Sequence, residues 1–449
     1  GIEFDSSSNN TVSGNTVTNH HYGGWKAGIA LISSSNNTIT GNNMSKNKME
    51  VSLSYSSGNN ISGNNFDGFD PLDPYNHGIK LEYSSNNTIS GNDVANHDGF
   101  GIKLSYSSNN GVSGNEIHSN FNGGLLLEYS SNNNVSGNHV WYNWLIAIEI
   151  SYSTNNTLRG NIMGTHPGGW SFGVYGDSLS HFLHDVDVSN TIDGKPVYYW
   201  INAQDATVPL DAGYVALVNC TRITVRNLNL SRNGQSILLA CTTNTTITQN
   251  SVVYNRDSGI WLWSSSNNTV SGNNVTGGWL IGLDGIVLIA SSNNTISSNN
   301  VTDNDGSGIE LYSSSGNNIS GNKVTNNYKG IALSSSSDNA IYHNDFINNA
   351  IQASLSTGFV NAWDDGYPSG GNYWSDYSGV DLYSGPYQNE TGSDAIGDTP
   401  YIINADNRDR YPFMSPWPPE HDIAVINIAP SKTVVGQGYS LNINVTAAN

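Results

Sequence analysis

The stretch that decides the fold is "SSSNNTVSGNTVTN", residues 6–19, because close variants of it return along most of the chain. Such variants begin at Ser33, Ser84, Ser107 and Ser264. A compact enzyme domain rarely repeats one phrase, whereas arrays of stacked structural units repeat theirs at a fixed period. The repetition therefore predicts an array.

The apolar residue that follows each "NNT" or its variant sets the period of this array. Most successive anchors lie 22 to 28 residues apart, and 23 is the commonest spacing. A period in the twenties is typical of a solenoid. The anchors are Val12, Ile39, Ile61, Ile89, Val112, Val135, Leu158, Ile223, Ile247, Val270, Ile296, Ile319 and Ile341.

Each repeat contains three short apolar stretches of period two. In one repeat, Ile102 and Leu104 precede the anchor Val112, and Ile117 follows it. Ser, Asn and Gly separate the stretches, which indicates short strands joined by tight turns. Neither a sustained helical period nor a leucine-rich consensus is present. We therefore predict an all-β, right-handed parallel β-helix with about 22–23 residues per coil, since parallel crossovers are right-handed.

Two columns of the repeat carry polar or aromatic side chains at fixed positions. An Asn such as Asn42 or Asn115 lies three residues after nearly every anchor, which predicts a turn whose amides bond from coil to coil. Six residues before five successive anchors lies a Tyr, either a structural stack or a sugar-binding platform. These tyrosines are Tyr55, Tyr83, Tyr106, Tyr129 and Tyr152.

The composition favours an extracellular or cell-surface setting and excludes nucleic acid as a partner. The 449 residues include 36 Asp and Glu against 16 Lys and Arg, a formal net charge of −20, whereas nucleic-acid binding depends on basic residues. No run of eighteen apolar residues occurs, so no membrane span is expected. No signal peptide is evident, and both ends fall within a pattern, which suggests a processed chain or a fragment.

Seventeen N-x-S/T sequons occur, and they indicate either ordinary turn chemistry or N-glycosylation of an exported protein. We expect export and leave the number of modified sites open. The sequon asparagines are Asn9, Asn36, Asn43, Asn60, Asn86, Asn134, Asn155, Asn219, Asn229, Asn244, Asn267, Asn274, Asn293, Asn300, Asn318, Asn389 and Asn444.

Two further segments are similar to a known family. The motifs "GNYWSDY", "IGDTPY" and "DRYPFM" lie between residues 371 and 414, and "FGVYGDSLSHFLHDVDVSN" begins at residue 172. Both segments resemble the NosD-type β-helix proteins, named for a periplasmic copper-handling protein and familiar from large surface proteins of methanogens and related archaea. The resemblance covers most of residues 1–417. It implies a right-handed β-helix, usually exported, and says little about activity.

These observations divide the chain into three parts. Residues 1–355 are predicted to form the β-helix, and residues 356–417 a NosD-type closing segment. Residues 418–449 resemble the first strands of an immunoglobulin-like adhesion module, the beginning of a β-sandwich, or a donated strand segment. The regular spacing fails after Leu158, which predicts an inserted hairpin or flap at about residues 191–213.

Acid–base chemistry has one candidate place. The loop "FDGFDPLDPYNHG" carries Asp70, Asp73 and His77, which resembles in part the motif of alginate epimerases. Carbohydrate-active enzymes need acid, base and charge-neutralising groups close together. Asp and Pro are also ordinary turn formers, so we expect no catalytic residue here. An enzyme of the lyase or epimerase type is the alternative.

Metal binding was weighed for two ions. Copper needs clustered His, Met or Cys, whereas the four Met are scattered, so we do not expect copper. Calcium, the one cofactor considered further, takes oxygen ligands, and aspartates crowd the closing segment. They either bind Ca²⁺ or serve as turn residues in a polar cap. The candidates are Asp364, Asp365, Asp376, Asp381, Asp394 and Asp398.

The cysteines and an apolar stripe complete the candidate features. Cys220 and Cys241 lie at neighbouring turns of adjacent predicted coils, so they form either a disulfide or two small buried residues. An outward apolar stripe is either covered within the molecule, which we favour, or is a docking face for a glycan or another subunit. The stripe includes Trp261, Trp263, Val287 and Ile289.

Taken together, the sequence predicts an extracellular structural or adhesive surface protein that forms a rigid, glycosylated rod. Open coil ends favour head-to-tail self-association into a filament or layer, or contact with other envelope components. The alternative is a carbohydrate-binding or carbohydrate-active β-helix protein. A copper-handling periplasmic protein is the least favoured interpretation.

Overall fold

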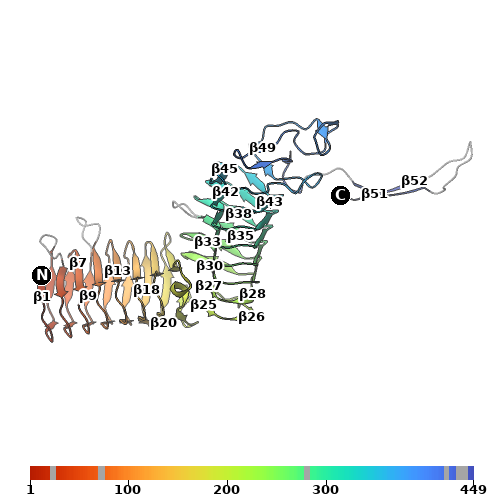
Figure 1. Cartoon of the computed structure of the whole chain (residues 1–449). Helices are drawn as coiled ribbons and strands as arrows, with labels where there is room; N and C mark the ends of the chain where they lie inside the picture. Colours follow the sequence, from red (N-terminus) through yellow and green to blue (C-terminus); the bar gives the residue numbers. More distant parts are fainter. Residues whose placement is uncertain (21–26, 69–75, 278–283, 419–423, 431–442, 449) are drawn as a thin grey trace, which may run out of the picture.

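The computed structural model describes residues 1–20, 27–68, 76–277, 284–418, 424–430 and 443–448. Within these ranges, strands account for every regular element except one 3-10 turn, η1 (Leu179–Phe182). The strands stack in parallel, coil upon coil, so the predicted all-β parallel solenoid is confirmed. The coils form two straight segments that meet at an elbow (Figure 1).

The first segment has three parallel faces. Its long face contains β1 (Ile2–Asp5), β4 (Ala27–Ile32), β7 (Met49–Ser54), β10 (His77–Glu82), β13 (Phe100–Ser105), β16 (Gly123–Glu128), β19 (Ile146–Ser151) and β22 (Trp170–Tyr175). Its middle face contains β2 (Thr11–Ser13), β5 (Thr38–Thr40), β8 (Asn60–Ser62), β11 (Thr88–Ser90), β14 (Gly111–Ser113), β17 (Asn134–Ser136), β20 (Thr157–Arg159) and β23 (Asp185–Val186). Its third face contains β3 (Thr16–Thr18), β6 (Asn43–Ser45), β9 (Asn65–Asp67), β12 (Asp93–Ala95), β15 (Glu116–His118), β18 (His139–Asn143), β21 (Ile162–Thr165) and β24 (Thr191–Ile192).

The second segment repeats this plan. Its long face contains β25 (Lys195–Ile201), β27 (Tyr214–Val218), β30 (Gln235–Ala240), β33 (Ser258–Trp263), β36 (Asp284–Ile289), β39 (Ser307–Tyr312), β42 (Lys329–Ser334) and β45 (Ile351–Leu355). Its middle face contains β26 (Gln204–Thr207), β28 (Thr221–Arg226), β31 (Thr246–Thr248), β34 (Thr269–Ser271), β37 (Thr295–Ser297), β40 (Asn318–Ser320) and β43 (Ala340–Tyr342). Its third face contains β29 (Asn229–Ser231), β32 (Ser251–Val253), β35 (Asn274–Thr276), β38 (Asn300–Thr302), β41 (Lys323–Thr325), β44 (Asp345–Ile347) and β46 (Tyr373–Trp374).

The elbow bears on two predictions. Of the alternatives for residues 191–213, the hairpin is present, because β25 pairs antiparallel with β24. It is not a separate flap, because β25 also pairs parallel with β27 and is the first long strand of the second segment. The third face of the first segment therefore continues into the long face of the second. This exchange of faces bends the solenoid, so the chain is not one straight rod (Figure 1). The coils also extend past residue 355, since β46 pairs with β44.

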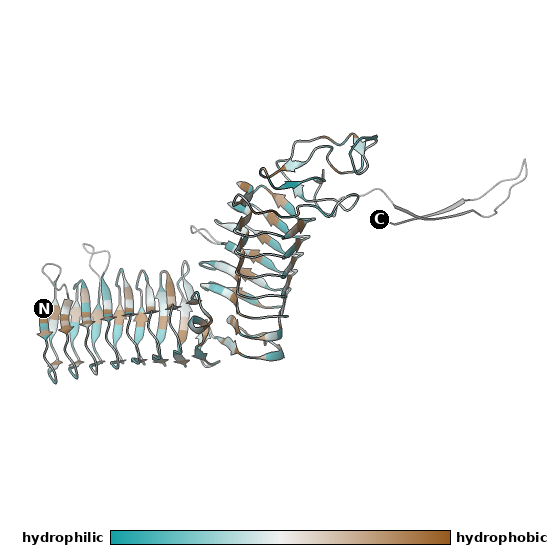
Figure 2. Ribbon diagram, viewed as in Figure 1, coloured by the Kyte–Doolittle hydropathy of each residue, from teal (hydrophilic) through white to brown (hydrophobic). Residues whose placement is uncertain are grey.

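Each segment has its own hydrophobic core. Inward residues such as Ile102, Leu104, Val112 and Ile117 are fully buried, and they are the apolar positions of the repeat. Figure 2 shows hydrophobic and hydrophilic residues alternating along the strands, as expected where one side of each strand faces the core.

Ladders of buried polar side chains connect the coils at the turns. Asn115 donates from its backbone N (3.1 Å) and Nδ2 (2.9 Å) to Asn138 Oδ1 in the next coil. The same Nδ2 donates back to Ile89 O at 3.0 Å, so the predicted Asn ladder is confirmed. Further ladders that were not predicted run through the second Asn of "NNT", as in Asn110, through a Ser column, as in Ser107, and through an Asn column at the turns before the long face, as in Asn120.

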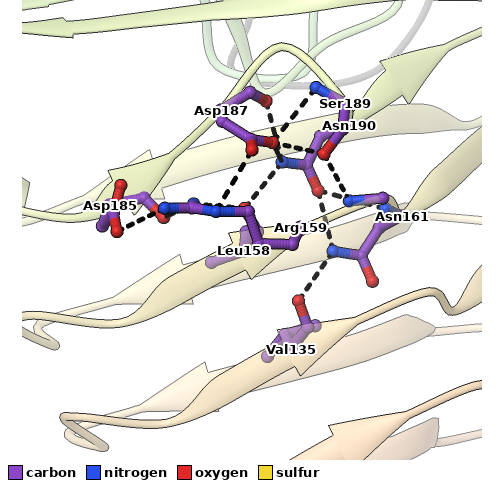
Figure 3. A network of polar contacts seen from close by, with 9 residues as sticks. Val135, Leu158, Arg159, Asn161, Asp185, Asp187, Ser189 and Asn190 are labelled. Carbon is purple, nitrogen blue, oxygen red and sulfur yellow. Dashed lines mark hydrogen bonds and ion pairs between the residues drawn. The ribbon is translucent and has the colours of Figure 1, made fainter.

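Both segments end in caps that complete these ladders. In the first, Asn161 donates from Nδ2 to Asn190 Oδ1 at 2.8 Å, and Arg159 pairs with Asp187 at 3.1 Å (Figure 3). In the second, the closing segment supplies Asn407 and Asp409 as the last members. The segment's short strands are β47 (Tyr383–Ser384), β48 (Glu390–Thr391), β49 (Tyr401–Ile402) and β50 (Arg408–Asp409).

The C-terminal tail contributes two strands that pair antiparallel with each other, β51 (Ala424–Pro430) and β52 (Ile443–Ala448). An immunoglobulin-like module in this region stays a prediction. None of the described residues forms a helix that is long and apolar enough to cross a membrane.

Candidate functional site

A contiguous group of exposed aromatic side chains lies where β15, β18 and β21 turn back toward the long face. We call these turns the return turns and the group the aromatic band. Its exposed members are Phe121 (48%), Trp141 (37%), Tyr142 (47%) and Trp144 (49%). Contiguous apolar patches of this kind are uncommon on soluble proteins and mark binding sites.

Two regular positions of the repeat create the band. Val140 points into the core, so alternation turns Trp141 outward. Tyr142, in the left-handed region at φ 55°, holds the turn position that Ser119 (φ 58°) holds in the preceding coil, and it also points outward. Asn143 then returns to the interior as a ladder amide. The end of β18 and its turn residue therefore place two adjacent rings on the surface.

Ring contacts join the members into one surface. Phe121 and Trp144 lie with centroids 5.6 Å apart, and Trp144 stacks on His166 at 4.6 Å with 25° between the planes. Tyr142 meets the same imidazole edge-on at 4.6 Å. The rings are thus held by one another and present a fixed shape to solvent.

Polar groups border Trp141 on the third face. His118 stacks on the indole at 4.8 Å, and His139 lies 5.9 Å from it. Each imidazole pairs with a carboxylate, His118 with Asp93 at 3.2 Å and His139 with Glu116 at 2.9 Å. Sugars present apolar C–H faces and hydroxyl edges, so an aromatic surface bordered by hydrogen-bonding groups suits them.

The band runs into the elbow. His166 O accepts from Arg232 Nη1 at 3.2 Å, and Trp170 Nε1 donates to Tyr254 O at 3.1 Å, so the return turns of both segments touch. Burial, followed by the nearby Arg232 guanidinium, lowers the pKa of His166. These contacts fix one end of the aromatic band against the second segment.

Half-buried charged and polar side chains hold the elbow itself. Arg256 of the second segment donates to Glu149 of β19 at 2.6 Å, and Tyr175 of β22 donates to Asp257. Burial raises the pKa of Asp257 and Tyr175. Because both partners of each pair come from different segments, the angle at the elbow is a defined feature of the fold.

The predicted acid–base loop is only partly within the described residues. Asp70 and Asp73 lie outside them. His77 is half-buried at the start of β10, and its Nδ1 accepts from Phe100 N at 2.9 Å. Burial, with smaller contributions from Lys103 and Lys80, lowers the pKa of His77 to about 4. Its imidazole therefore supports the backbone of the neighbouring coil, and an acid–base role for the loop stays untested.

The aspartates of the closing segment hold that segment together. Asp364 pairs with Arg410 at 2.7 Å, and Asp376 accepts from Tyr401. Among the described residues, no group of three or more His, Cys, Asp or Glu is arranged to hold a metal ion, and calcium binding stays untested. The remaining candidates also accept hydrogen bonds, Asp365 and Asp394 from nearby residues and Asp381 and Asp398 across the segment.

The two cysteines are not bonded to each other. Cys220 lies in the buried Ser/Thr column, and its backbone N donates to Thr242 Oγ1 of the next coil at 3.2 Å. Cys241 is one position earlier, in the left-handed turn residue at φ 51°, level with Asn219. The offset of one residue points the two side chains in different directions, so of the two alternatives this structure has two free cysteines, of which Cys220 is buried and Cys241 half-buried.

The proposed docking face is largely covered within the molecule. The rings of Trp261 and Trp263 lie 6.0 Å and 5.1 Å from the ring of Phe182. Val287 is buried and Ile289 half-buried. The cover comes from the end of the first segment, not from a flap or the closing segment, because the elbow folds β22 and η1 over this stripe.

Most sequon asparagines are accessible. Fourteen of the seventeen are exposed, Asn60 and Asn318 are half-buried, and the side chain of Asn444 lies outside the described residues. In "NNT" the first Asn, such as Asn36 at φ 56°, faces solvent while the second belongs to a buried ladder. Glycosylation stays a prediction, and the geometry leaves these positions reachable.

Comparison with solved structures finds distant likenesses. The tailspike of E. coli bacteriophage HK620 is 10% identical (TM-score 0.33; 78% of this chain, 71% of that chain). The A-module of mannuronan C-5 epimerase AlgE4 of Azotobacter vinelandii is 13% identical (TM-score 0.30; 75% and 83%). The Dettilon tailspike protein is 13% identical (TM-score 0.27). The match includes 75% of this chain but only 59% of that tailspike. No curated protein matches the sequence.

Family models give the stronger result. The model described as "Periplasmic copper-binding protein (NosD)" matches residues 1–102 and 190–379, well over half of the chain. The model described as "Right handed beta helix region" matches residues 69–190 and so bridges the gap between the two. The match agrees with the stacked parallel coils. The chain therefore belongs to the NosD family of right-handed parallel β-helix proteins.

Proposed function

We propose that this chain is an exported β-helix protein of the cell surface or envelope that binds glycans through the aromatic band. The observation that carries the proposal is the exposure of Trp141, Tyr142 and Trp144 side by side on an otherwise Asn-, Ser- and Thr-rich surface. Exposed aromatic rings that neighbouring rings already hold in place bind with little further loss of conformational entropy.

The rest of the molecule acts as a rigid support for this surface. Buried Asn ladders tie each coil to the next, and the elbow contacts fix the two segments to each other. The family description as periplasmic and the many exposed sequons support export. An adhesive role follows, because a rigid scaffold can hold a glycan-binding surface away from its attachment point.

Copper handling is not part of this proposal, although the family description names copper. Met44 and Met163 are fully buried in the hydrophobic core, where their thioethers pack against apolar residues. They therefore fill space in the coils instead of offering soft ligands to an ion.

Glycan binding can be tested on an oligosaccharide array with the purified protein. The double variant Trp141→Ala/Trp144→Ala should bind at least tenfold more weakly, about 1.4 kcal/mol. Tyr83→Ala is the matched control, because Tyr83 is an equally exposed ring (46%) in the Tyr stack of the long-face corner. Equal losses in both variants, or no binding by the unmodified chain, would contradict the proposal.

A second candidate function is glycan cleavage or epimerisation, and one pair of carboxylates favours it. Burial, with the neighbouring Glu310, raises the pKa of Asp284 to about 7. Ser307 N donates to Asp284 Oδ1 at 2.5 Å and ties the pair to β39. A carboxyl that keeps its proton near neutral pH can act as a general acid. We expect the unmodified chain to release products from bound glycans, and Asp284→Asn to bind the same glycans without releasing products. If the unmodified chain turns over none of the glycans that it binds, this second function is excluded.

A further inference from the structure

One position beside Trp141 in the aromatic band has no side chain. His118 and Trp141 pair on the successive strands β15 and β18, and Gly164 of β21 lies against Trp141, where the register between β18 and β21 shifts. His118 covers one face of the Trp141 indole at 4.8 Å with 22° between the planes. On the other side of Trp141, Gly164 offers no side chain to stack.

The backbone does not require glycine at this position. Gly164 is not among the residues with positive φ, so an L-residue could adopt its conformation. A Cβ there would lie 3.9 Å from Asp193 Oδ1, an ordinary contact, and 3.3 Å from Trp141 Cβ, so that Trp141 would have to shift by a few tenths of an ångström. Gly164 therefore leaves open a space between Trp141 and Asp193, which we call the Gly164 slot.

The slot has the thickness of one ring. Neighbouring coils lie about 4.8 Å apart, so the backbones of Trp141 and Asp193, two coils apart, are separated by about twice that distance. Asp193 Oδ1 reaches back into this space, to 3.9 Å from the place of a Gly164 Cβ that would lie 3.3 Å from Trp141 Cβ. A single ring in van der Waals contact with the indole occupies one such interval. The slot continues the spacing of the stack that His118 and Trp141 begin.

The walls of the slot differ in chemistry. Trp141 supplies an apolar face, and Ile162, 52% exposed on the same strand as Gly164, adds apolar surface beside it. Asp193 supplies a carboxylate, whose lone pairs can accept hydrogen bonds from hydroxyl groups in addition to its present interaction. An apolar face opposite a hydrogen-bond acceptor matches the face and edge of a sugar ring.

We propose that the Gly164 slot holds one sugar ring of a neutral glycan, stacked on Trp141 and hydrogen-bonded to Asp193. The inference rests on the proposed glycan-binding function and specifies its ligand. Acidic sugars are excluded by charge, because Asp193 forms a wall of the slot, Asp93 and Glu116 lie beside the band, and the chain carries a formal net charge of −20.

The test fills the slot from the protein side. Gly164→Phe places a ring where the sugar would stack, whereas Gly164→Ala adds one methyl group and leaves most of the space. Titration calorimetry would use cellohexaose, chitohexaose and mannohexaose as neutral probes and hexagalacturonate as the acidic one. We expect at least one neutral probe to bind, with affinity at least tenfold lower in Gly164→Phe and within about twofold in Gly164→Ala. Unchanged circular dichroism and melting temperature show that each variant is folded.

Each other outcome overturns a separate part of the account. Binding that survives Gly164→Phe but is lost in Trp144→Ala leaves the aromatic band as a glycan site and removes the slot. Stronger binding of hexagalacturonate than of any neutral probe overturns the ligand class. Failure of the unmodified protein to bind any of the four probes overturns the slot, and failure on the full oligosaccharide array overturns the proposed function. If Gly164→Phe does not fold, Trp141→Ala must show the same loss, and retained binding in that variant refutes the slot.

Discussion

Glu50 Oε1 lies 4.0 Å from His97 Nε2, and both side chains are fully buried at the return turns of the first segment. Glu50 accepts from Asn47 Nδ2 at 2.5 Å, while His97 Nδ1 contacts Asn120 Oδ1 at 2.9 Å. Asn47 and Asn120 belong to an Asn ladder that this pair joins: Glu50, in the same coil as Asn47, accepts from that amide, and His97 holds the ladder position in the coil before Asn120. A carboxyl group and an imidazole thus complete a ladder that amides build elsewhere.

The pair should give the stability of the protein a particular pH dependence. Burial raises the pKa of Glu50 to about 8 and lowers that of His97 to about 4. Between about pH 6.5 and 8 the folded state keeps a proton on Glu50 that the unfolded chain has released, so stability falls by about 2 kcal/mol as pH rises. The lowered pKa of His97 acts in the opposite direction. Its contribution to the free energy of unfolding is present above about pH 6.5 and is lost as pH falls from about 6.5 to 4. In urea unfolding experiments, the Glu50→Gln variant should not show this fall in the free energy of unfolding between pH 6.5 and 8.

The exposed Glu82 provides the control for that experiment. Glu82→Gln removes a carboxyl that is paired with Lys80 at the surface, so its unfolding curve should follow the pH dependence of the unmodified protein. If Glu50→Gln and Glu82→Gln show the same slope above pH 6.5, Glu50 is not the group responsible.

Removal of a ladder amide should be costly. Asn115→Ala removes the Nδ2 donor to Ile89 O and Asn138 Oδ1 and the Oδ1 acceptor of Asn92 N and Nδ2 in a buried turn, and Asn138 Oδ1 keeps only the backbone N of residue 115. We expect a loss of about 2–4 kcal/mol in the free energy of unfolding, measured in urea. Asn109→Gly is the control, because Asn109 is a positive-φ turn residue (58°) that glycine can replace without strain. Comparable losses at both positions would show that the ladder has no special role.

The cap formed by Asp409 should protect the last coils of the second segment. Asp409 is fully buried and accepts from Asn372 N at 2.7 Å and Trp374 Nε1 at 2.9 Å. Asp409→Ala should speed amide hydrogen exchange in residues 339–374 and leave the first segment unchanged. Asp406→Ala, at an exposed neighbouring position, should have no such effect. Protection that is retained in Asp409→Ala would mean that the closing segment does not cap the coils.

The cysteines should titrate as two free thiols of unequal reactivity. Cys220 is buried and Cys241 half-buried, and burial raises the pKa of both. In the folded protein a disulfide-exchange reagent should modify Cys241 first. After denaturation without reductant, both thiols should react. Recovery of no free thiol under those conditions would show that the two residues are bonded.

Much of the fold could be predicted because the repeat encodes it locally. The anchor Val112 and the pair Ile102 and Leu104 fixed the strands, and the column of Asn115 fixed a turn. The Asn ladder formed by the second Asn of each "NNT", such as Asn110, was overlooked. Its signal was present, since this Asn recurs just as regularly.

The elbow could not be derived in the same way. The repeats on either side of it have the same pattern, and the change of direction depends on one hairpin, in which β25 takes the place of a long strand. Tyr199 is buried in that strand, whereas its aromatic neighbourhood suggested a separate flap. Local patterns give the direction of a side chain relative to its own strand but not the path of the solenoid axis.

The aromatic band was missed for a related reason. Regular columns, such as the Tyr stack, stand out in a repeat, whereas Trp141, Tyr142 and Trp144 occupy three different positions of a single coil. The end of β18 and the return turn after it bring them to one surface. A cluster of large aromatic residues in one return turn was the available signal.

The most direct test of the account is a crystal structure of the protein soaked with the neutral oligosaccharide that binds best. The account predicts electron density for sugar along the aromatic band, with one ring over Gly164 against the indole of Trp141. Sugar bound instead along the Tyr stack or on the second segment, with the aromatic band empty, would contradict it.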